Sequence, residues 1–585
     1  MAAGERAGTS RRVVFVADEL LGYAGNGIGT TTTFVSLALA RAGRDVEVLF
    51  AGRAPSGAVD AEWQQLYDRA GVGVQMVPEG TETVEPRHFT RMRDVEAILR
   101  ADPPEVVVVQ DLGALAYTAL RLRCLGLAFE RTSFVVFCHG TRRWITDVSR
   151  KVRVLPGAHA VTVLERASVE LADAVVSPSS YLVDWMRGEG WQLPAQTFVI
   201  PHVSRAGATG ELPPVRAGTG PERVERLAFF GRLEERKGLR PFLGALNALE
   251  PELLERFELE FIGRPTPAWP VERITSLLSE RTRHAVRSVS FETALDQHEA
   301  LARLSRPGTL AVMPSFEENS PNTIYECLEH QIPFIASNAA GIRELVAPED
   351  HARVLFTPTE EGITHALRGV LSDGERLRTA RPAFDDAESL GRWDEVFALP
   401  ARAFPPRPRV SAIDPDWVLL LEETDVPDPE LVENLVRAQQ VSGADVVSCG
   451  VVVDDTVHLF PGEPGALGLL GNGYGTVALV RRSLVQSDTG VARWPLLAEL
   501  SLAGAKIVSI PMPLVASAAA PADLDSRPTE ALRVLKHFER ALPHQARFLA
   551  ELVTRTAAQT SRPSPPVTRS LARRAVRRLV RGRSR

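Results

Sequence analysis

Two glutamates eight residues apart, Glu318 and Glu326, lie in the stretch of the chain that is best suited to chemistry. This stretch, residues 310–346, reads as a strand, an acidic loop, a helix, a strand, a glycine turn and a helix. Ser320 and Pro321 form a typical helix start, with the serine as N-cap and the proline in the first turn. We therefore expect Glu318 in the loop at the carboxyl end of a strand and Glu326 inside the helix, both facing the crevice where open α/β sheets bind ligands.

The chemistry that this pair suits is the binding of a nucleotide-sugar. A helix N-terminus attracts phosphate, and one carboxylate can bind the ribose hydroxyls while the other binds the sugar hydroxyls. An amphipathic helix with solvated acids is the structural alternative.

The surrounding segment resembles the donor-site signature of family 4 glycosyltransferases, which are retaining enzymes of the GT-B fold. The upstream MPS and the downstream PFIAS and AAGIREL match that family together with the paired glutamates. The resemblance implies that Glu318 holds the hydroxyls of the transferred sugar and Glu326 the ribose, with Ser320 also at the donor. It further implies front-face attack, in which the leaving phosphate helps to deprotonate the acceptor, so that no protein nucleophile, metal or other cofactor is expected.

A second motif, FFGRLEERKG at residues 229–238, offers cations for a diphosphate. A diphosphate leaving group gains negative charge in the transition state, which fixed cations and backbone amides stabilise. Arg232 follows a strand, and Lys237 lies five residues later at the start of the next helix. The matching arginine and lysine of family 4 hold the donor diphosphate, whereas we expect Arg236 to be a solvated neighbour. Two solvated surface cations are the alternative.

The glycine-rich segment GYAGNGIGTTTT, at residues 22–33, is not a dinucleotide fingerprint, because its glycines fall as GxGxG and well after the first strand. It resembles instead the family loop that follows the first strand and covers the donor phosphates and the acceptor. Glycines there let the backbone approach closely, so Gly27 and Gly29 are the predicted donor contacts. A plain flexible turn is the alternative.

His139, in VVFCHGT, is predicted to end a buried strand that faces the cleft. The family often has a histidine in this region, where it can hydrogen-bond a sugar hydroxyl and support developing charge. His139 therefore joins Glu318 as a predicted catalytic residue, with a structural strand-end histidine as the alternative.

The composition is that of a chain with several globular units. Its 585 residues imply three or four domains, and a net charge of −6 indicates no general attraction to nucleic acid. The four cysteines are scattered without metal-ligand spacing, which favours a reducing compartment. An apolar signal core is lacking, as is an uninterrupted apolar run of ~18–20 residues, so we expect a cytoplasmic protein.

Alternating apolar runs and helical patterns predict an α/β fold with parallel sheets. Two such sets, joined by a linker rich in proline and glycine, describe the GT-B architecture of two Rossmann-like domains with a cleft between them. The predicted organisation is an N-terminal, acceptor-side Rossmann-like domain (1–205), a linker (206–222), a C-terminal Rossmann-like domain that binds the nucleotide-sugar (223–375), a closing helical segment (376–405), a degenerate GT-A-like domain (406–520) and a helical, basic tail (521–585).

Residues 406–520 resemble the second half of family 2 glycosyltransferases, which have the GT-A fold. In that family the first strand ends in a metal-binding Asp-x-Asp, whereas here the strand ends in EETD (422–425), and DPD (414–416) precedes the strand. We interpret the aspartates of DPD as turn formers. The segment is expected to be a non-catalytic remnant that packs against the rest or guides the acceptor.

The last residues, Arg569–Arg585, contain eight arginines and no acid. On a helical wheel the arginines separate from the leucines, valines and alanines, which predicts a basic amphipathic helix. Such a helix can lie on an anionic membrane, where each basic residue contributes about 1 kcal/mol. A disordered basic tail and an RNA-binding tail are the alternatives.

The expected function is transfer of a sugar from a nucleotide-sugar, a UDP- or GDP-sugar, to a glycan or lipid-linked acceptor with retention of configuration. We expect the enzyme in the cytoplasm, peripherally on the inner face of the membrane. One alternative is a nucleotide-sugar epimerase, which shares the GT-B shape. Another is a non-catalytic scaffold that binds nucleotide-sugar or glycan in envelope polysaccharide assembly.

Overall fold

The chain forms two compact units in the computed structural model. The first comprises residues 1–153 and 161–406, and the second comprises residues 154–160 and 407–585. The structure describes residues 11–25, 27–53, 59–149, 156–210, 223–372, 377–406, 413–464, 468–485, 493–517, 528–539, 550–551 and 554. The basic segment 569–585 and most of the tail thus lie outside the described residues.

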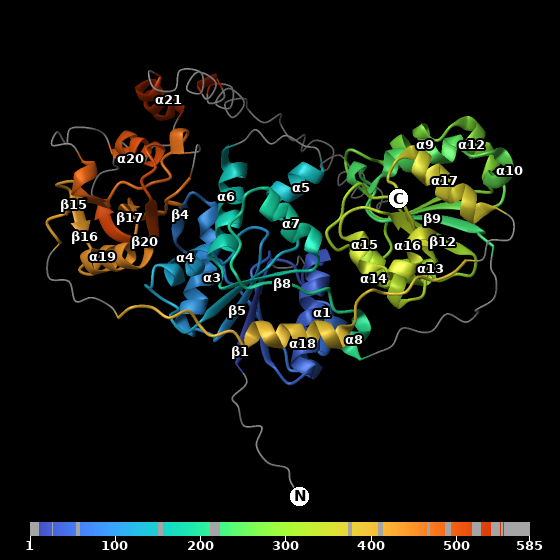
Figure 1. Cartoon of the computed structure of the whole chain (residues 1–585), viewed down its shortest axis with the longest axis horizontal. Helices are drawn as coiled ribbons and strands as arrows, with labels where there is room; N and C mark the ends of the chain where they lie inside the picture. Colours follow the sequence, from blue (N-terminus) through green and yellow to red (C-terminus); the bar gives the residue numbers. More distant parts are fainter. Residues whose placement is uncertain are drawn as a thin grey trace, which may run out of the picture. The chain divides into compact units, whose positions relative to one another are not determined.

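The first half of the larger unit, here called the N-lobe, is built on a parallel seven-stranded sheet (Figure 1). Its strand order is β3-β2-β1-β5-β6-β7-β8, so the direction of winding reverses between β1 and β5. The central strand β5 reads VVVVQ and is buried along its whole length, because helices cover both faces of a parallel sheet. The strands are β1 (Arg12–Ala17), β2 (Asp45–Phe50), β3 (Gly73–Met76), β5 (Val106–Gln110), β6 (Ser133–Phe137), β7 (Ala174–Ser177) and β8 (Thr197–Val199).

The glycine-rich segment of the N-lobe is helical where a loop was predicted. Helix α1 begins at Gly27, so Gly27 and Gly29 form its first turn. A side chain on Gly29 would place its Cβ 2.9 Å from the backbone nitrogen of Leu20, so the helix packs closer to the loop after β1 than another residue allows. The remaining elements of the N-lobe chain segment are α1 (Gly27–Arg41), α2 (Ala61–Ala70), β4 (Thr83–Glu85), α3 (His88–Ala101), α4 (Tyr117–Cys124), α5 (Arg142–Val148), α6 (Pro156–Leu171), α7 (Ser180–Gly188) and α8 (Arg205–Thr209).

The second half, here called the C-lobe, repeats the architecture with a six-stranded parallel sheet in the order β11-β10-β9-β12-β13-β14. Its strands are β9 (Arg226–Phe230), β10 (Glu258–Ile262), β11 (Val289–Glu292), β12 (Thr309–Met313), β13 (Phe334–Ser337) and β14 (Leu355–Phe356). Its helices are η1 (Glu235–Lys237), α9 (Leu239–Ala248), α10 (Pro251–Leu254), α11 (Val271–Leu277), α12 (Glu280–Ala285), α13 (Gln297–Leu304), α14 (Asn322–Glu329), α15 (Ile342–Leu345), η2 (Pro348–Asp350), α16 (His351–Val354) and α17 (Glu360–Leu371). Two Rossmann-like lobes in one unit are the GT-B fold that the sequence predicts.

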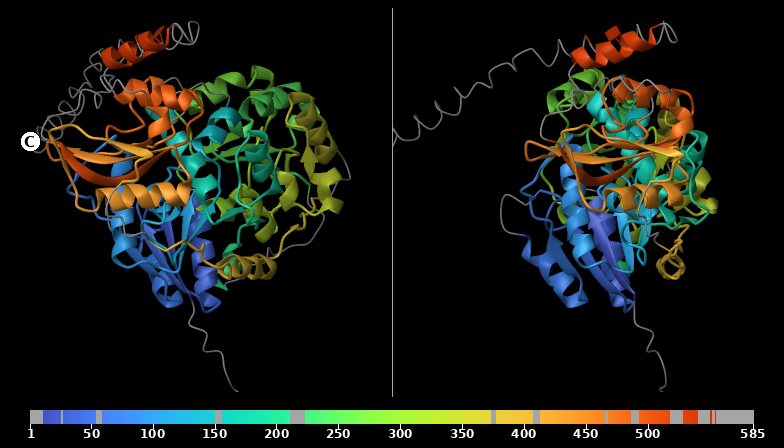
Figure 2. Two further views of the ribbon diagram at one scale, coloured as in Figure 1. Left: turned by 60° about the vertical axis from the view of Figure 1, so that its left-hand side comes forward. Right: turned by 90° about the vertical axis from the view of Figure 1, so that its left-hand side faces the viewer.

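Helix α18 (Asp386–Phe397) follows the C-lobe in sequence but returns to the N-lobe (Figures 1 and 2). Trp393 is 1% exposed and belongs to the N-lobe core. Its ring centroid lies 6.3 Å from that of Phe15 on β1 and 5.2 Å from that of Phe137 on β6. The C-lobe is therefore inserted between two parts of the N-lobe.

The second unit contains a mixed sheet. Strand β17 pairs antiparallel with β18 and β19 and parallel with β20, while β15 pairs with β19 and β16 with β20. Its elements are β15 (Trp417–Leu420), β16 (Asp425–Pro427), α19 (Leu431–Ser442), β17 (Val446–Val453), β18 (Thr456–His458), β19 (Ala478–Arg481), η4 (Arg482–Leu484), α20 (Arg493–Leu502), β20 (Ile507–Ser517) and α21 (Pro528–Phe538).

The acidic residues in the turns of the second unit form hydrogen bonds and ion pairs within the protein. Asp414 accepts a hydrogen bond from the backbone N–H of Asp416 at 2.9 Å, which confirms that the DPD aspartates form a turn before β15. Glu422 pairs with Arg493 at 3.1 Å. Across the residues that the structure describes, no group of three or more His, Cys, Asp or Glu side chains is placed to hold a metal ion.

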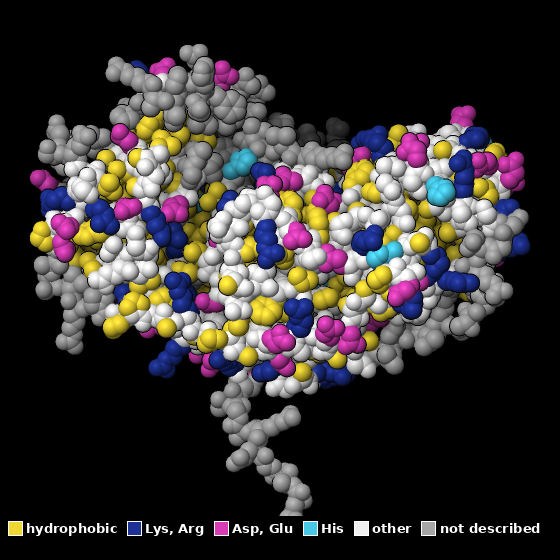
Figure 3. All heavy atoms as spheres, viewed as in Figure 1, with side chains coloured by type: hydrophobic (Ala, Val, Ile, Leu, Met, Phe, Trp, Pro, Cys, Tyr) yellow, Lys and Arg dark blue, Asp and Glu magenta, His cyan; other side chains and the backbone are white. Residues whose placement is uncertain are grey.

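Positively and negatively charged side chains are mixed on the surface of the larger unit. On the face shown in Figure 3, Lys and Arg side chains are interspersed with Asp and Glu side chains. Every helix in the described part of the chain is too short or too polar to cross a lipid bilayer.

Candidate functional site

A cavity of about 860 Å³ lies between the two lobes of the larger unit. One wall comes from the C-lobe, where β9, β10 and β11 end and α13 and α14 begin, and the other comes from the loop after β1 and the starts of α1, α2 and α8. Open α/β sheets bind ligands at the carboxyl ends of their strands, so the cavity lies where a ligand is expected. The charged residues lining it are Asp60, Glu62, Arg205, Arg232, Arg264, Glu292, Asp296 and Glu326.

Three of the eight predicted site residues line this cavity, namely Gly27, Arg232 and Glu326. Lys237 and Glu318 form an ion pair that is joined to the cavity wall through other side chains. Gly29, His139 and Ser320 lie in the elements around it, at the start of α1, after β6 and before α14.

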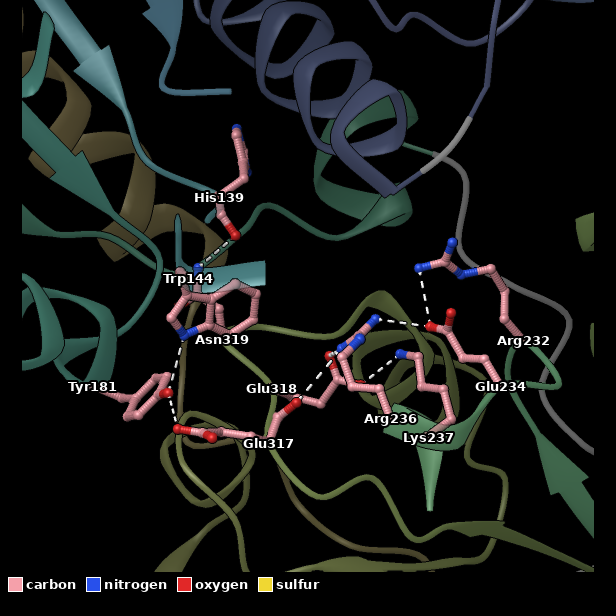
Figure 4. A network of polar contacts seen from close by, with 10 residues as sticks. All are labelled: His139, Trp144, Tyr181, Arg232, Glu234, Arg236, Lys237, Glu317, Glu318 and Asn319. Carbon is pink, nitrogen blue, oxygen red and sulfur yellow. Dashed lines mark hydrogen bonds and ion pairs between the residues drawn. The ribbon is translucent and has the colours of Figure 1, made fainter. Parts of the chain in front are cut away.

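Glu318 is held between two cations (Figure 4). Its Oε1 lies 2.5 Å from Nζ of Lys237, and its Oε2 lies 3.1 Å from Nη1 of Arg236. Burial raises the pKa of Glu318, but Lys237 and Arg236 outweigh this effect and lower it to about 2. With only 8% of its side chain exposed, Glu318 is therefore a buried, ionised carboxylate at neutral pH.

The prediction that Arg236 is solvated is wrong. Its side chain is 13% exposed and pairs with both Glu318 and Glu234, whereas Arg232 is 61% exposed and pairs with Glu234 at 3.2 Å. The four side chains form a continuous chain of charges from the cavity wall at Arg232 to the buried carboxylate of Glu318 (Figure 4).

The 3-10 turn η1 explains why both cations reach Glu318. Gly238 ends the turn with a φ of 73°, and a Cβ there would lie 1.8 Å from the carbonyl oxygen of Pro314. Only glycine allows this approach. The backbone N–H of Phe316 donates to the carbonyl of Arg236 at 3.0 Å, so the loop after β12 is fixed against the turn.

Glu326 lies on α14 and lines the cavity. Nε2 of Gln297, the first residue of α13, donates to Oε1 of Glu326 at 2.5 Å. Burial raises the pKa of Glu326 to about 7. The pKa values of the two glutamates thus lie on opposite sides of the usual value, because two cations lie beside Glu318 whereas burial dominates at Glu326.

This raised pKa predicts a pH-dependent stability. Between about pH 4.5 and 7 the folded protein holds the Glu326 proton more tightly than the unfolded chain does, so this group makes the fold less stable as the pH rises through that range. We expect Glu326→Gln to gain up to about 3 kcal/mol in free energy of unfolding relative to wild type between pH 5 and pH 8. Urea unfolding at both pH values measures the gain, with Glu280→Gln on exposed α12 as the control. An equal difference at both pH values would contradict the assignment.

The start of α14 differs from the prediction. The helix begins at Asn322 with Pro321 at the N-cap position, so Ser320 does not cap it. Ser320 Oγ is instead 2.9 Å from the hydroxyl of Tyr325. Nδ2 of Asn322 donates to the carbonyl of Gly27 at 3.0 Å and joins the starts of α14 and α1 across the lobes. Asn322 was not among the predicted site residues.

His139 lies two residues after the end of β6 and is anchored through its backbone. Its N–H donates to Asp111 Oδ1 at 3.0 Å, and its carbonyl accepts from Nδ2 of Asn319 at 3.1 Å. Burial, with His202 nearby, holds the pKa of His139 well below its usual value. The ring is therefore neutral at pH 7 and is suited to hydrogen bonding without carrying charge.

His202 is a second residue that sequence reasoning did not place in the site. Its ring stacks on Tyr325 of α14 with centroids 5.1 Å apart, and its backbone N–H donates to the Tyr325 hydroxyl at 2.9 Å. The ring centroids of His202 and His139 are 5.9 Å apart.

The loop that carries Glu318 is fixed to the N-lobe by its neighbours. Asn319 Oδ1 accepts from Ser179 Oγ. Glu317 accepts from the hydroxyl of Tyr181 (Figure 4). Glu344 of α15 accepts from the backbone N–H groups of Ser180 and Tyr181 at 2.7 and 2.9 Å, which places a carboxylate at the N-terminus of α7. These contacts hold the lobes together around the site.

Comparison with protein families finds two matching models. One is described as "Glycosyl transferase 4-like domain" and matches residues 26–202, and the other is described as "Glycosyl transferases group 1" and matches residues 224–373. These ranges correspond to the N-lobe and the C-lobe. Neither model extends into residues 406–520, so the resemblance of that segment to family 2 stays a prediction.

Curated relatives and solved structures are also similar to this chain. A glycogen synthase of Mycobacterium tuberculosis (strain H37Rv) is 27% identical over 443 residues, which cover 69% of this chain and 98% of that protein. The sucrose-phosphate synthase from Thermosynechococcus elongatus is 19% identical with a TM-score of 0.46, covering 66% of this chain and 96% of that one. HepE from Anabaena, in complex with UDP and glucose, is 16% identical with a TM-score of 0.44, covering 66% and 99%.

Proposed function

We propose that this chain, which carries both domains of a GT-B glycosyltransferase, moves a sugar from a nucleotide-sugar to a glycan or lipid-linked acceptor with retention of anomeric configuration. The proposal rests mainly on the buried Glu318 carboxylate, which lies between Lys237 and Arg236. This cluster is next to a cavity that Arg232 and Glu326 line. A buried charged cluster costs free energy to assemble, so its position beside a large cavity favours a role in binding.

The charges of the cluster fit the parts of a nucleotide-sugar. Arg232 is exposed to the cavity, and it and Lys237 are the cations proposed to stabilise the negative charge that develops on the leaving diphosphate. Glu318, ionised and oriented by two cations, can accept hydrogen bonds from hydroxyls of the transferred sugar. Glu326 is the proposed acceptor for the ribose hydroxyls.

Two neutral groups complete the proposed donor site. His139 has an uncharged ring at neutral pH, so it can hydrogen-bond a sugar hydroxyl without repelling an oxocarbenium-like charge. The first turn of α1, with Gly27 at the cavity, brings backbone N–H groups toward the donor phosphates. Retention and independence from metal are supported by the family 4 signature of residues 310–346, and a UDP- or GDP-sugar is the proposed donor.

A thermal-shift panel tests the donor site. UDP-, GDP-, ADP- and dTDP-glucose are each added to wild type and to Glu326→Ala, with and without EDTA. We expect one nucleotide-sugar to raise the melting temperature by several degrees in wild type, unchanged by EDTA, and not in Glu326→Ala. Glu280→Ala, on exposed α12 of the same lobe, serves as the control and keeps the shift.

The outcomes separate the alternatives. If none of the four nucleotide-sugars shifts the melting temperature, a non-catalytic scaffold is favoured. If the stabilising sugar is converted to its epimer without an acceptor, the chain is an epimerase. A shift that EDTA abolishes would contradict metal independence.

A further inference from the structure

We infer that the acceptor of the proposed transfer is an uncharged, hydroxyl-rich carbohydrate rather than a phosphorylated lipid, and that it packs on Trp63 in the N-lobe wall of the cavity. The inference rests on the proposed function, because that function assigns Arg232, Glu326 and Gly27 to the donor and leaves the part of the wall at α2 for the acceptor. A cavity of about 860 Å³ is near the upper end of the usual range for small-molecule sites. It thus leaves room for a second substrate against the opposite wall.

An indole ring forms part of that wall. Trp63, on the first turn of α2, lines the cavity and is half-buried. The ring faces of pyranose sugars expose C–H groups, which pack on aromatic side chains, and tryptophan offers the largest such surface with a polar edge. The guanidinium of Arg205 lies 5.5 Å from the ring centroid of Trp63 and adds N–H donors for hydroxyl oxygens beside the ring.

The charges on this wall disfavour an anionic acceptor. Asp60 and Glu62 are both exposed, and both line the cavity together with Arg205. Glu62 lies 3.9 Å from Arg205, and this part of the wall carries two carboxylates and one cation. A phosphate or pyrophosphate group beside Asp60 and Glu62 would meet net negative charge, whereas sugar hydroxyls can donate to these carboxylates.

The wall is preorganised by the packing behind it. Gly22 has a φ of 85°, and a Cβ there would lie 2.8 Å from the Cβ of Trp63, so the loop after β1 rests directly on α2. Phe34 of α1 approaches the indole from within the lobe, with ring centroids 6.5 Å apart. Asp60 also caps α2 by accepting from the backbone N–H of Glu62 at 2.9 Å. Fixed groups of this kind bind without a large ordering cost.

Isothermal titration of the full chain tests the inference. The neutral probes are maltoheptaose, cellohexaose and mannohexaose, and the anionic probe is farnesyl phosphate. We expect at least one neutral oligosaccharide to bind wild type, with its Kd raised about tenfold by Trp63→Ala and about threefold by Glu62→Ala. Trp63→Phe is expected to restore most of the affinity. Trp185→Ala, a half-buried tryptophan of α7 outside the cavity lining, leaves the Kd unchanged.

Glu62→Ala keeps the test valid if Trp63→Ala fails to fold, because the Glu62 side chain is 75% exposed. The inference is overturned if no neutral oligosaccharide binds, if both variants bind as wild type does, or if farnesyl phosphate binds and Trp63→Ala removes that binding. Titration of the four nucleotide-sugars in parallel separates the two proposals. If a nucleotide-sugar binds but no oligosaccharide does, only the acceptor subsite is overturned. If none of the four nucleotide-sugars binds, the result counts against the transferase.

Discussion

Replacing Lys237 by alanine is expected to lower kcat/KM for sugar transfer by about 10²–10³-fold, the usual effect of removing one group that stabilises transition-state charge. Lys237 is one of two cations on the buried Glu318 carboxylate, with Nζ 2.5 Å from Oε1. Its loss removes a positive charge from the proposed diphosphate site and leaves Glu318 with Arg236 alone. Steady-state kinetics at saturating acceptor, with donor concentration varied, measures the effect.

Arg240→Ala is the matched control for this variant. Arg240 lies three residues further on, at the second position of α9, and its side chain is 53% exposed and pairs with Glu235. Surface pairs of this kind contribute little, so activity is expected to stay within about twofold. Lys237→Arg is expected to recover only part of the activity, because a planar guanidinium cannot replace a compact ammonium group. A Lys237→Ala enzyme with undiminished turnover would remove Lys237 from the site.

Trp393→Ala is expected to lower the free energy of unfolding of the larger unit by about 3–5 kcal/mol, the usual cost of removing a buried tryptophan from a core. The ring is 1% exposed and packs between Phe15, Phe137 and Phe397. Urea unfolding followed by far-UV circular dichroism measures the loss. Because the chain has two units, their transitions are fitted separately.

Glu395→Ala, two residues along the same helix, provides the control. Glu395 is exposed, so its replacement is expected to change the free energy of unfolding by no more than about 0.5 kcal/mol. Equal stability of Trp393→Ala and Glu395→Ala would show that α18 is not part of the N-lobe core in solution.

The parallel sheets could be predicted from the sequence because their strands are buried on both faces. Strand β5, VVVVQ, and strand β12, TLAVM, appear as continuous apolar runs between helical patterns. The position of Glu318 after β12 followed from the same pattern, since carboxyl ends of parallel strands gather at one edge of a sheet.

Other features depend on contacts that cannot be predicted from a local sequence pattern. Gly27 and Gly29 are poor helix formers, and the start of α1 is stabilised instead by its close packing on the loop after β1. Arg232 and Arg236 have the same chemistry and lie two and six residues after β9. Only the geometry of η1 and the approach of Gly238 to Pro314 decide which one is buried against Glu318.

The return of α18 to the N-lobe has a consequence for how the protein is made. The N-lobe core cannot close until Trp393 has left the ribosome, about 190 residues after β8 has emerged. At a synthesis rate of ~5–20 residues per second this delay is about 10–40 s. During that time Phe15 and Phe137 lack the ring that covers them, while the C-lobe, whose sheet is continuous in sequence, can already fold. The nascent N-lobe thus exposes apolar surface, of the kind that chaperones bind, for about half of the synthesis of the larger unit.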